Sequence, residues 1–325
     1  MSPAHLRRKA LQMLLLCTSF WALSFPLMKT LGLTQQQILP GAGSWFLSSL
    51  CVLFRFLSAG LLLLLVSPTQ IKTASRREME QGIWLAFFAS AGICLQMDGL
   101  AYVSASTSAF LTQLYCVLIP LWVAVSRLCF PTVKILICSV LVLCGMAILV
   151  KLNLFALRLG RGELETLASA VMFTAQILWL EHPRYAANRP QCFTTIMLLA
   201  MGLFAVPVVV VTAPGMAECF RVYRSLPACG LVAGLVLVCS LSPFLLMNRW
   251  QREVTATEAG LVYCAEPVLV SVLALFLPGW LSHWTGVEYA NEQVTARLLF
   301  GGGLITAANV LLQSRWLEAK RVGRG

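Results

Sequence analysis

The chain has 325 residues, of which 59% are hydrophobic and 11% charged, and its mean hydropathy is +0.81. Soluble domains contain about 25% charged residues, so this composition excludes a soluble enzyme, a disordered tail and a coiled coil. The net charge of +11 does not indicate nucleic-acid binding, because the basic residues form no long run and lie between hydrophobic stretches.

Ten apolar stretches follow one another along the chain, and each is close to the ~20 residues that a helix needs to cross a bilayer. They cover 11–33, 45–66, 82–103, 106–126, 133–151, 163–181, 193–212, 228–248, 257–278 and 297–316. We therefore expect an all-α membrane protein with ten transmembrane helices and little sequence left for any domain outside the membrane.

The positions of Lys and Arg predict the orientation of these helices. With the N-terminus inside, 16 of them fall in cytoplasmic segments and six on the opposite side. The cytoplasmic ones lie before the first stretch, in 67–81, 127–134, 182–192 and 249–253, and from Arg315 onward. The positive-inside rule then predicts that both termini are cytoplasmic, although the loop 152–162 is basic on the wrong side.

An internal repeat links the fourth stretch to the ninth. Residues 104–111 (SASTSAFL) resemble residues 255–262 (TATEAGLV) at an offset of 151, and the similarity continues from 117–119 to 268–270. Stretches one to five therefore correspond to stretches six to ten, and because five is odd the two copies cross the membrane in opposite senses. We expect two inverted five-helix repeats, 1–155 and 156–325, which is a transporter architecture.

Several short motifs, in order and in the expected helices, resemble one family. These are residues 20–29 (FWALSFPLMK), 54–60 (FRFLSAG), 102–106 (YVSAS) and the pair Glu266-Pro267. Together they resemble the EamA-type permeases of the drug/metabolite transporter superfamily. Two departures are Ala22, where many relatives have glycine, and Tyr115-Cys116, where a Glu-Pro pair is expected. The resemblance implies transport of small organic molecules such as amino acids, nucleotide-like metabolites or drugs, in a bacterial inner membrane.

Charged residues inside the apolar stretches require an explanation, because each costs about 2.5–3.5 kcal/mol at the bilayer centre. Glu266 lies near the middle of the ninth stretch, and Pro267 removes a backbone donor directly after it. We consider two roles for Glu266: a proton- or cation-linked contact with substrate, or a structural hydrogen bond to a neighbouring helix.

Arg55 lies near the middle of the second stretch and stays charged at any relevant pH. It either binds a substrate carboxylate or phosphate, or acts as a fixed strut paired with Glu266 or with helix-end carbonyl groups. Lys29 and Asp98 lie toward the outer ends of their stretches. For Lys29 we expect snorkelling, with a contact to substrate as the alternative. For Asp98 we expect interfacial hydrogen bonding, with a role at the external mouth as the alternative.

Uncharged polar and aromatic residues within the stretches complete the predicted cavity. Tyr115 matches Glu266 at the repeat offset, so inversion would bring both near the centre. Gln96 and Trp179 are further candidates for the lining. The candidate substrate-binding or coupling residues are Glu266, Arg55, Tyr115, Gln113, Tyr263, Gln176 and Trp21.

These features favour a secondary transporter that works by alternating access, with export inferred from the resemblance alone. We expect no catalytic residues, no cofactor and no metal site, because His5, His182 and His283 lie outside the stretches and no Walker sequence is present. The alternatives are an intramembrane enzyme, a lipid flippase without an ATPase domain, and a static scaffold or receptor. The expected partners are a small-molecule substrate and the lipid bilayer. The sequence leaves open the substrate, the transport direction, the coupling ion and whether the chain forms a homodimer.

Overall fold

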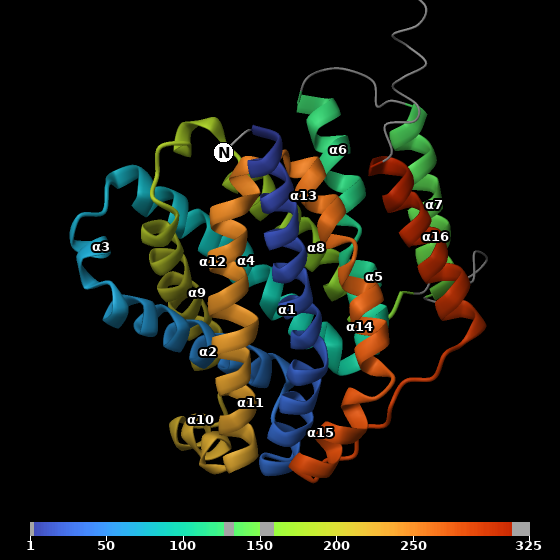
Figure 1. Ribbon diagram of the computed structural model, residues 1–325. Coiled ribbons are helices and arrows are strands. Elements are labelled where there is room, and N and C mark those ends of the chain that lie inside the picture. Colours follow the sequence, from blue (N-terminus) through green and yellow to red (C-terminus); the bar gives the residue numbers. More distant parts are fainter. Residues whose placement is uncertain (1–2, 127–132, 150–158, 314–325) are drawn as a thin grey trace, which may run out of the picture.

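The computed structural model describes residues 3–126, 133–149 and 159–313, and within these ranges it contains helices and turns but no strand. The boundary predicted at residue 155 and the basic residues from Arg315 onward lie outside these ranges. Figure 1 shows the helices as one bundle, with α1 running through its middle.

The first half of the chain provides a helix for each of its five apolar stretches, and the fourth is interrupted. The helices are α1 (Pro3–Ile38), α2 (Ser44–Val66), the short α3 (Pro68–Lys72), α4 (Arg76–Tyr102), α5 (Ala105–Thr112), α6 (Tyr115–Ser126) and α7 (Val133–Leu149).

The second half likewise has helical segments at all five of its stretches, and two of these stretches are divided. The segments are α8 (Arg161–Leu180), η1 (Pro183–Tyr185), α9 (Pro190–Thr212), α10 (Met216–Arg221), η2 (Val222–Arg224), α11 (Leu226–Val236), the π-helical turn η3 (Leu237–Leu241), α12 (Ser242–Trp250), η4 (Gln251–Glu253), α13 (Ala256–Tyr263), α14 (Glu266–Ala274), α15 (Leu277–Thr285) and α16 (Ala296–Gln313).

Local sequence explains where several of these helices begin. Ser75 and Glu78 form a capping box at the start of α4. Pro190 occupies the first turn of α9, where its missing N–H group costs no helical hydrogen bond. Gly286, at a φ of 74°, ends α15 in the left-handed conformation that glycine adopts without strain.

Six helical segments within the described ranges are long and apolar enough to cross a membrane: 5–38, 44–66, 76–102, 105–126, 190–212 and 226–253. The pair α14 and α15, bent by 56°, would add a seventh, and 136–145 and 296–308 are shorter apolar helices. Several helices of this kind are typical of a helical membrane protein. The ten spans predicted from the sequence exceed the six or seven found here. Part of the difference arises because Arg161, Glu163 and Glu165 make the start of α8 polar, and because the ninth stretch is divided between α13 and α14.

Close helix packing is clearest between α2 and α9. A Cβ atom added to Gly60 would lie 2.7 Å from the backbone nitrogen of Leu199, and one added to Gly202 would lie 2.8 Å from that of Leu57. The contact is therefore reciprocal: in each helix the glycine meets the leucine that lies three residues before the partner's glycine. The residue numbers of the contacting pairs increase along α2 as they decrease along α9, so the two helices run antiparallel where they touch.

Ion pairs tie the helices together at both ends of the bundle. At the end where the N-terminus lies (Figure 1), Arg189 pairs with Glu78 at 2.8 Å and Arg184 with Glu80 at 2.9 Å. At the opposite end, Arg161 in the first turn of α8 pairs with the fully buried Asp98 of α4 at 2.5 Å. The segments 67–81 and 182–192, both predicted to be cytoplasmic, are thus brought to one end.

Candidate functional site

Two interrupted helices meet beside the candidate site. The turn at 113–114 separates α5 from α6, and the turn at 264–265 separates α13 from α14. The two turns are 151 residues apart, the same offset as the sequence repeat. In space α5 packs on α14 and α6 packs on α13, so the two interruptions lie where one broken helix passes the other.

Pro267 explains the second interruption. A proline cannot donate to the carbonyl group four residues before it, which here belongs to Tyr263. The side chain of Gln113 supplies a substitute, because its Nε2 lies 3.3 Å from that carbonyl oxygen. The same amide nitrogen is 3.3 Å from Oε2 of Glu266 and 3.2 Å from the hydroxyl of Tyr115. Gln113 therefore joins both interrupted helices through one side chain.

Two buried thiols also meet at this crossing. Cys116 in α6 and Cys264, which directly follows α13, have their Sγ atoms 2.7 Å apart, and both are free thiols. Each also lies near the carbonyl oxygen of Gly260, at 3.1 and 3.0 Å. The crossing is thus held by thiol and amide hydrogen bonds and not by an ion pair within the described residues.

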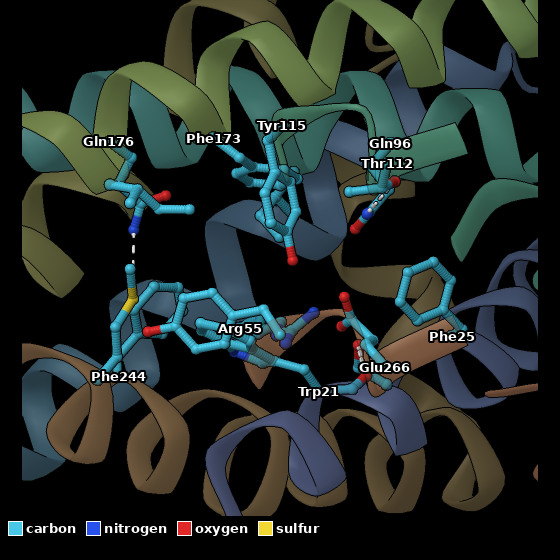
Figure 2. Close-up of a pocket in the computed structure, with 15 residues that line it drawn as sticks. Trp21, Phe25, Arg55, Gln96, Thr112, Tyr115, Phe173, Gln176, Phe244 and Glu266 are labelled. Atoms are coloured by element: carbon cyan, nitrogen blue, oxygen red, sulfur yellow. Dashed lines mark hydrogen bonds between the residues drawn. The ribbon is translucent and has the colours of Figure 1, made fainter. Parts of the chain in front are cut away.

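A cavity opens next to the crossing and encloses about 560 Å³ of empty space, its mouth included. Figure 2 shows Tyr115 on one side of the cavity, with Glu266 and Arg55 reaching in from the other. Glu266 is only 6% exposed, and no ion pair reaches its carboxylate in the part of the chain that the structure describes. The cavity therefore contains an acid held by an amide donor.

Arg55 of α2 is 1% exposed and spans the gap to the second half of the chain. Its Nη2 donates to the carbonyl oxygen of Cys239 at 2.8 Å and its Nε to the hydroxyl of Ser240 at 2.5 Å. Pro243 cannot make the helical hydrogen bond to the Cys239 carbonyl, so Arg55 takes that place. A guanidinium has five N–H donors, and with Met28 Sδ as the third acceptor at 3.2 Å, two N–H groups are left for a ligand.

Aromatic side chains form an apolar wall of the cavity. Trp21 contacts Tyr263 and Phe244 edge to face, with ring centroids 5.3 and 5.9 Å apart. The hydroxyl of Tyr263 donates to Oε1 of Gln251 at 2.8 Å, so its hydrogen bond is made within the protein. The wall thus suits the apolar part of a ligand.

Six of the seven residues predicted as the site line this cavity, and the seventh lies beside it. Trp21, Arg55, Tyr115, Gln176, Tyr263 and Glu266 belong to the lining, as does Gln96. Gln113 bonds to Glu266 from the crossing. Trp179 lies elsewhere, with its ring centroid 5.7 Å from that of Trp84 and 5.6 Å from that of Tyr185.

The two charged residues expected near the outer ends also lie outside this cavity. Lys29 Nζ donates to the carbonyl oxygens of Leu100 and Val103, at 2.9 and 2.5 Å, at the end of α4. Asp98 is held by Arg161, as described above.

The sequence did not single out several residues that complete the lining. They are Ser24, Phe25, Ile93, Thr112, Phe173, Ile177, Phe244 and Met247. Most are apolar and look like ordinary core residues. Pro243 was the available signal for the partners of Arg55, because a proline inside an apolar stretch leaves a carbonyl group to be satisfied. Among the described residues, no three His, Cys, Asp or Glu side chains form a group that could hold a metal ion.

The fold and the cavity define a helical membrane protein with a buried, mixed polar and aromatic pocket. Comparison with protein-family models gave no match, and neither did comparison with curated proteins. The chain is similar in fold to a protein whose crystal structure has been solved, with a TM-score of 0.57 and 15% sequence identity. The similarity covers 94% of this chain and 98% of that one.

Proposed function

We propose that the chain is a secondary transporter that moves small organic metabolites by alternating access. The observation that carries this proposal is the buried cavity containing Glu266 and Arg55 beside two crossing interrupted helices. Charged groups within membrane helices are costly and mark transport pathways, and interrupted helices at a repeat interface typically form substrate sites.

An inverted repeat supplies the mechanical basis for this activity. The helix interruptions repeat at the sequence offset of 151, and α2 meets α9 through the reciprocal contacts of Gly60 and Gly202. Reciprocal contacts are what a two-fold axis produces, and an antiparallel pairing requires that axis to run across the helices. Two such halves of ten spans in total could rock about the cavity and open it to each side in turn.

The cavity favours a zwitterion of the amino-acid type as substrate. The two remaining N–H groups of Arg55 suit a carboxylate, the carboxylate of Glu266 suits an ammonium group, and Trp21, Phe173 and Phe244 suit an apolar side chain. When the cavity closes, Glu266 would lose its contact with water. Binding and release of its proton would then depend on whether substrate occupies the cavity.

The membrane location and the direction of transport are inferred from the sequence. The excess of Lys and Arg on one side supports cytoplasmic termini, and the resemblance to EamA-type permeases supports a bacterial inner membrane and export. We therefore propose an exporter of small metabolites in that membrane.

Reconstituted vesicles test the proposal. Purified protein is placed in liposomes, a pH gradient is imposed, and uptake of each proteinogenic L-amino acid and of tetraphenylphosphonium, a drug-like cation, is measured. We expect accumulation of at least one amino acid, and we expect Glu266→Gln to abolish its dependence on the pH gradient because the amide cannot exchange a proton.

Glu288→Gln is the matched control, since Glu288 is exposed in the segment between α15 and α16. That variant should transport as the wild type does. Failure of every compound to enter or exchange would contradict the proposal, and gradient-driven uptake by Glu266→Gln would remove the coupling role.

A further inference from the structure

A second cavity lies further along the same three helices. On α1, the central cavity is lined by Trp21, Ser24 and Phe25, and the second one by residues from Met28 to Gln36. The lining shifts in the same direction on α4, from Ile93 and Gln96 to Met97, Leu100 and Ala101, and on α2, from Arg55 to Ser48, Leu47 and Ser44. The two cavities therefore follow one another toward the end of the bundle where α1 ends and α2 begins.

The central and the second cavity meet at a contact between two side chains. Met28 lines the second cavity and is 1% exposed, and its Sδ accepts from Nη1 of Arg55, which lines the central one. Methionine has three rotatable bonds and adapts its shape readily. The contact between the two cavities thus includes a flexible side chain.

The second cavity has its own polar groups. Lys29 Nζ makes two hydrogen bonds to carbonyl groups, and an ammonium has three donors, so one is left. No ion pair within 4 Å neutralises Lys29 among the described residues. Gln35 is fully buried, and its Oε1 has no hydrogen-bond partner in the described structure. An unpartnered buried acceptor is costly, which a ligand that donates a hydrogen bond would relieve.

We propose that this second cavity, hereafter the outer site, is a second binding site for the transported zwitterion, in series with the central cavity. Lys29 binds the carboxylate of the ligand there, and Gln35 accepts a hydrogen bond from one of its donor groups. The outer site encloses about 490 Å³ of empty space, its mouth included, which is comparable to the central cavity. The proposal rests on the proposed function, because the same class of ligand must occupy both sites.

Equilibrium binding to the purified full chain in lipid nanodiscs tests this arrangement. The probes are the radiolabelled proteinogenic L-amino acids, used singly, and the readout is the number of molecules bound per chain at saturation. We expect two for the wild type, one for Lys29→Gln and one for Glu266→Gln. Lys72→Gln, which alters an exposed lysine of α3, should still bind two.

Gln35→Leu provides a second variant if Lys29→Gln fails to fold, because Lys29 also holds the end of α4. It should likewise bind one molecule. A wild type that binds one molecule, lost in Glu266→Gln and kept in Lys29→Gln or Gln35→Leu, would overturn the outer site and leave the transporter proposal standing. Absence of binding by every probe would overturn both the outer site and the zwitterion assignment.

Discussion

Arg55 and Gln113 perform the same task at two different places. Each is a buried side chain that donates to a carbonyl oxygen for which a proline cannot make the helical hydrogen bond, at Cys239 and at Tyr263. In lipid an unsatisfied backbone group costs several kcal/mol. Such residues are therefore fixed by the backbone of another helix, even where they also line a cavity.

Arg55→Lys separates the charge of this residue from its shape. The shorter reach and single nitrogen of lysine cannot hold Ser240, Cys239 and Met28 together, so at least one buried acceptor loses its donor. We expect the free energy of unfolding to fall by about 1–3 kcal/mol, measured by thermal unfolding in detergent. Arg221→Lys, at an exposed position of α10, should be neutral. An unchanged melting temperature for Arg55→Lys would contradict the strut role.

The cost of burying charge is why Glu266 and Arg55 could be selected from sequence alone. Their partners could not, because the carbonyl of Cys239 lies 184 residues from Arg55 and becomes available only through the local effect of Pro243. The sequence allowed an ion pair between Glu266 and Arg55. In the structure Arg55 instead donates to the carbonyl oxygen of Cys239, and Glu266 accepts from Gln113. Phe25 and Phe173 were missed because a cavity-lining aromatic and a core aromatic have the same local pattern.

Among the elements, the ten apolar runs predicted where helices lie, because hydrophobic length is a direct property of sequence. Ten membrane spans are not confirmed, since six helical segments of the described residues, or seven with α14 and α15, are long and apolar enough to cross a membrane. A helix lies at every predicted run, with ends that differ by several residues at α1 and α4. The runs did not predict η3 or α15. The π-helical turn η3 coincides with the acceptors of Arg55, and α15 is set off from α14 by a bend of 56°. Both depend on contacts between segments, which apolar length does not encode.

The α2–α9 contact leads to a prediction at Gly60. A methyl group there would collide with the backbone of Leu199, and overpacking of this kind costs about 1–3 kcal/mol. Gly60→Ala and Gly202→Ala should therefore lower the melting temperature by similar amounts. Gly303→Ala is the control, since a Cβ atom at Gly303 of α16 meets nothing within 4 Å. Equal stability of Gly60→Ala and Gly303→Ala would show that the two helices are not in close contact.

The crossing of α6 and α13 yields a second prediction at this scale. Oxidation of Cys116 and Cys264 by copper phenanthroline would form an Sγ–Sγ bond as two electrons pass to copper and two protons are released. The bond would tie the two predicted repeats together, so transport in vesicles should stop and dithiothreitol should restore it. Cys116→Ser should transport normally after oxidation, whereas Cys229→Ser, which removes an exposed thiol, should still be arrested. Full activity of the cross-linked wild type would contradict relative motion at the crossing.

On the scale of the whole molecule, the orientation in the membrane can be tested independently of transport. Alkaline phosphatase fused after Ala42, Gly215 or Asn291 should be active in the periplasm, and the enzyme fused after Thr73 or Asn188 should be inactive. These positions lie in segments that ten spans with cytoplasmic termini place on opposite sides. Active fusions after Asn188 would contradict the ten-span topology, whatever the substrate.

The two carbonyl groups that lie four residues before a proline have a consequence for how the protein is made. Both donors, Arg55 and Gln113, precede residue 155, and both acceptors, at Cys239 and Tyr263, follow it. During translation the donors are thus already inserted when the acceptors leave the ribosome. A rearranged gene that encoded the second half first would present two bare carbonyl groups to lipid before their donors existed, so the order of the halves, and not only their pairing, favours assembly of the native chain.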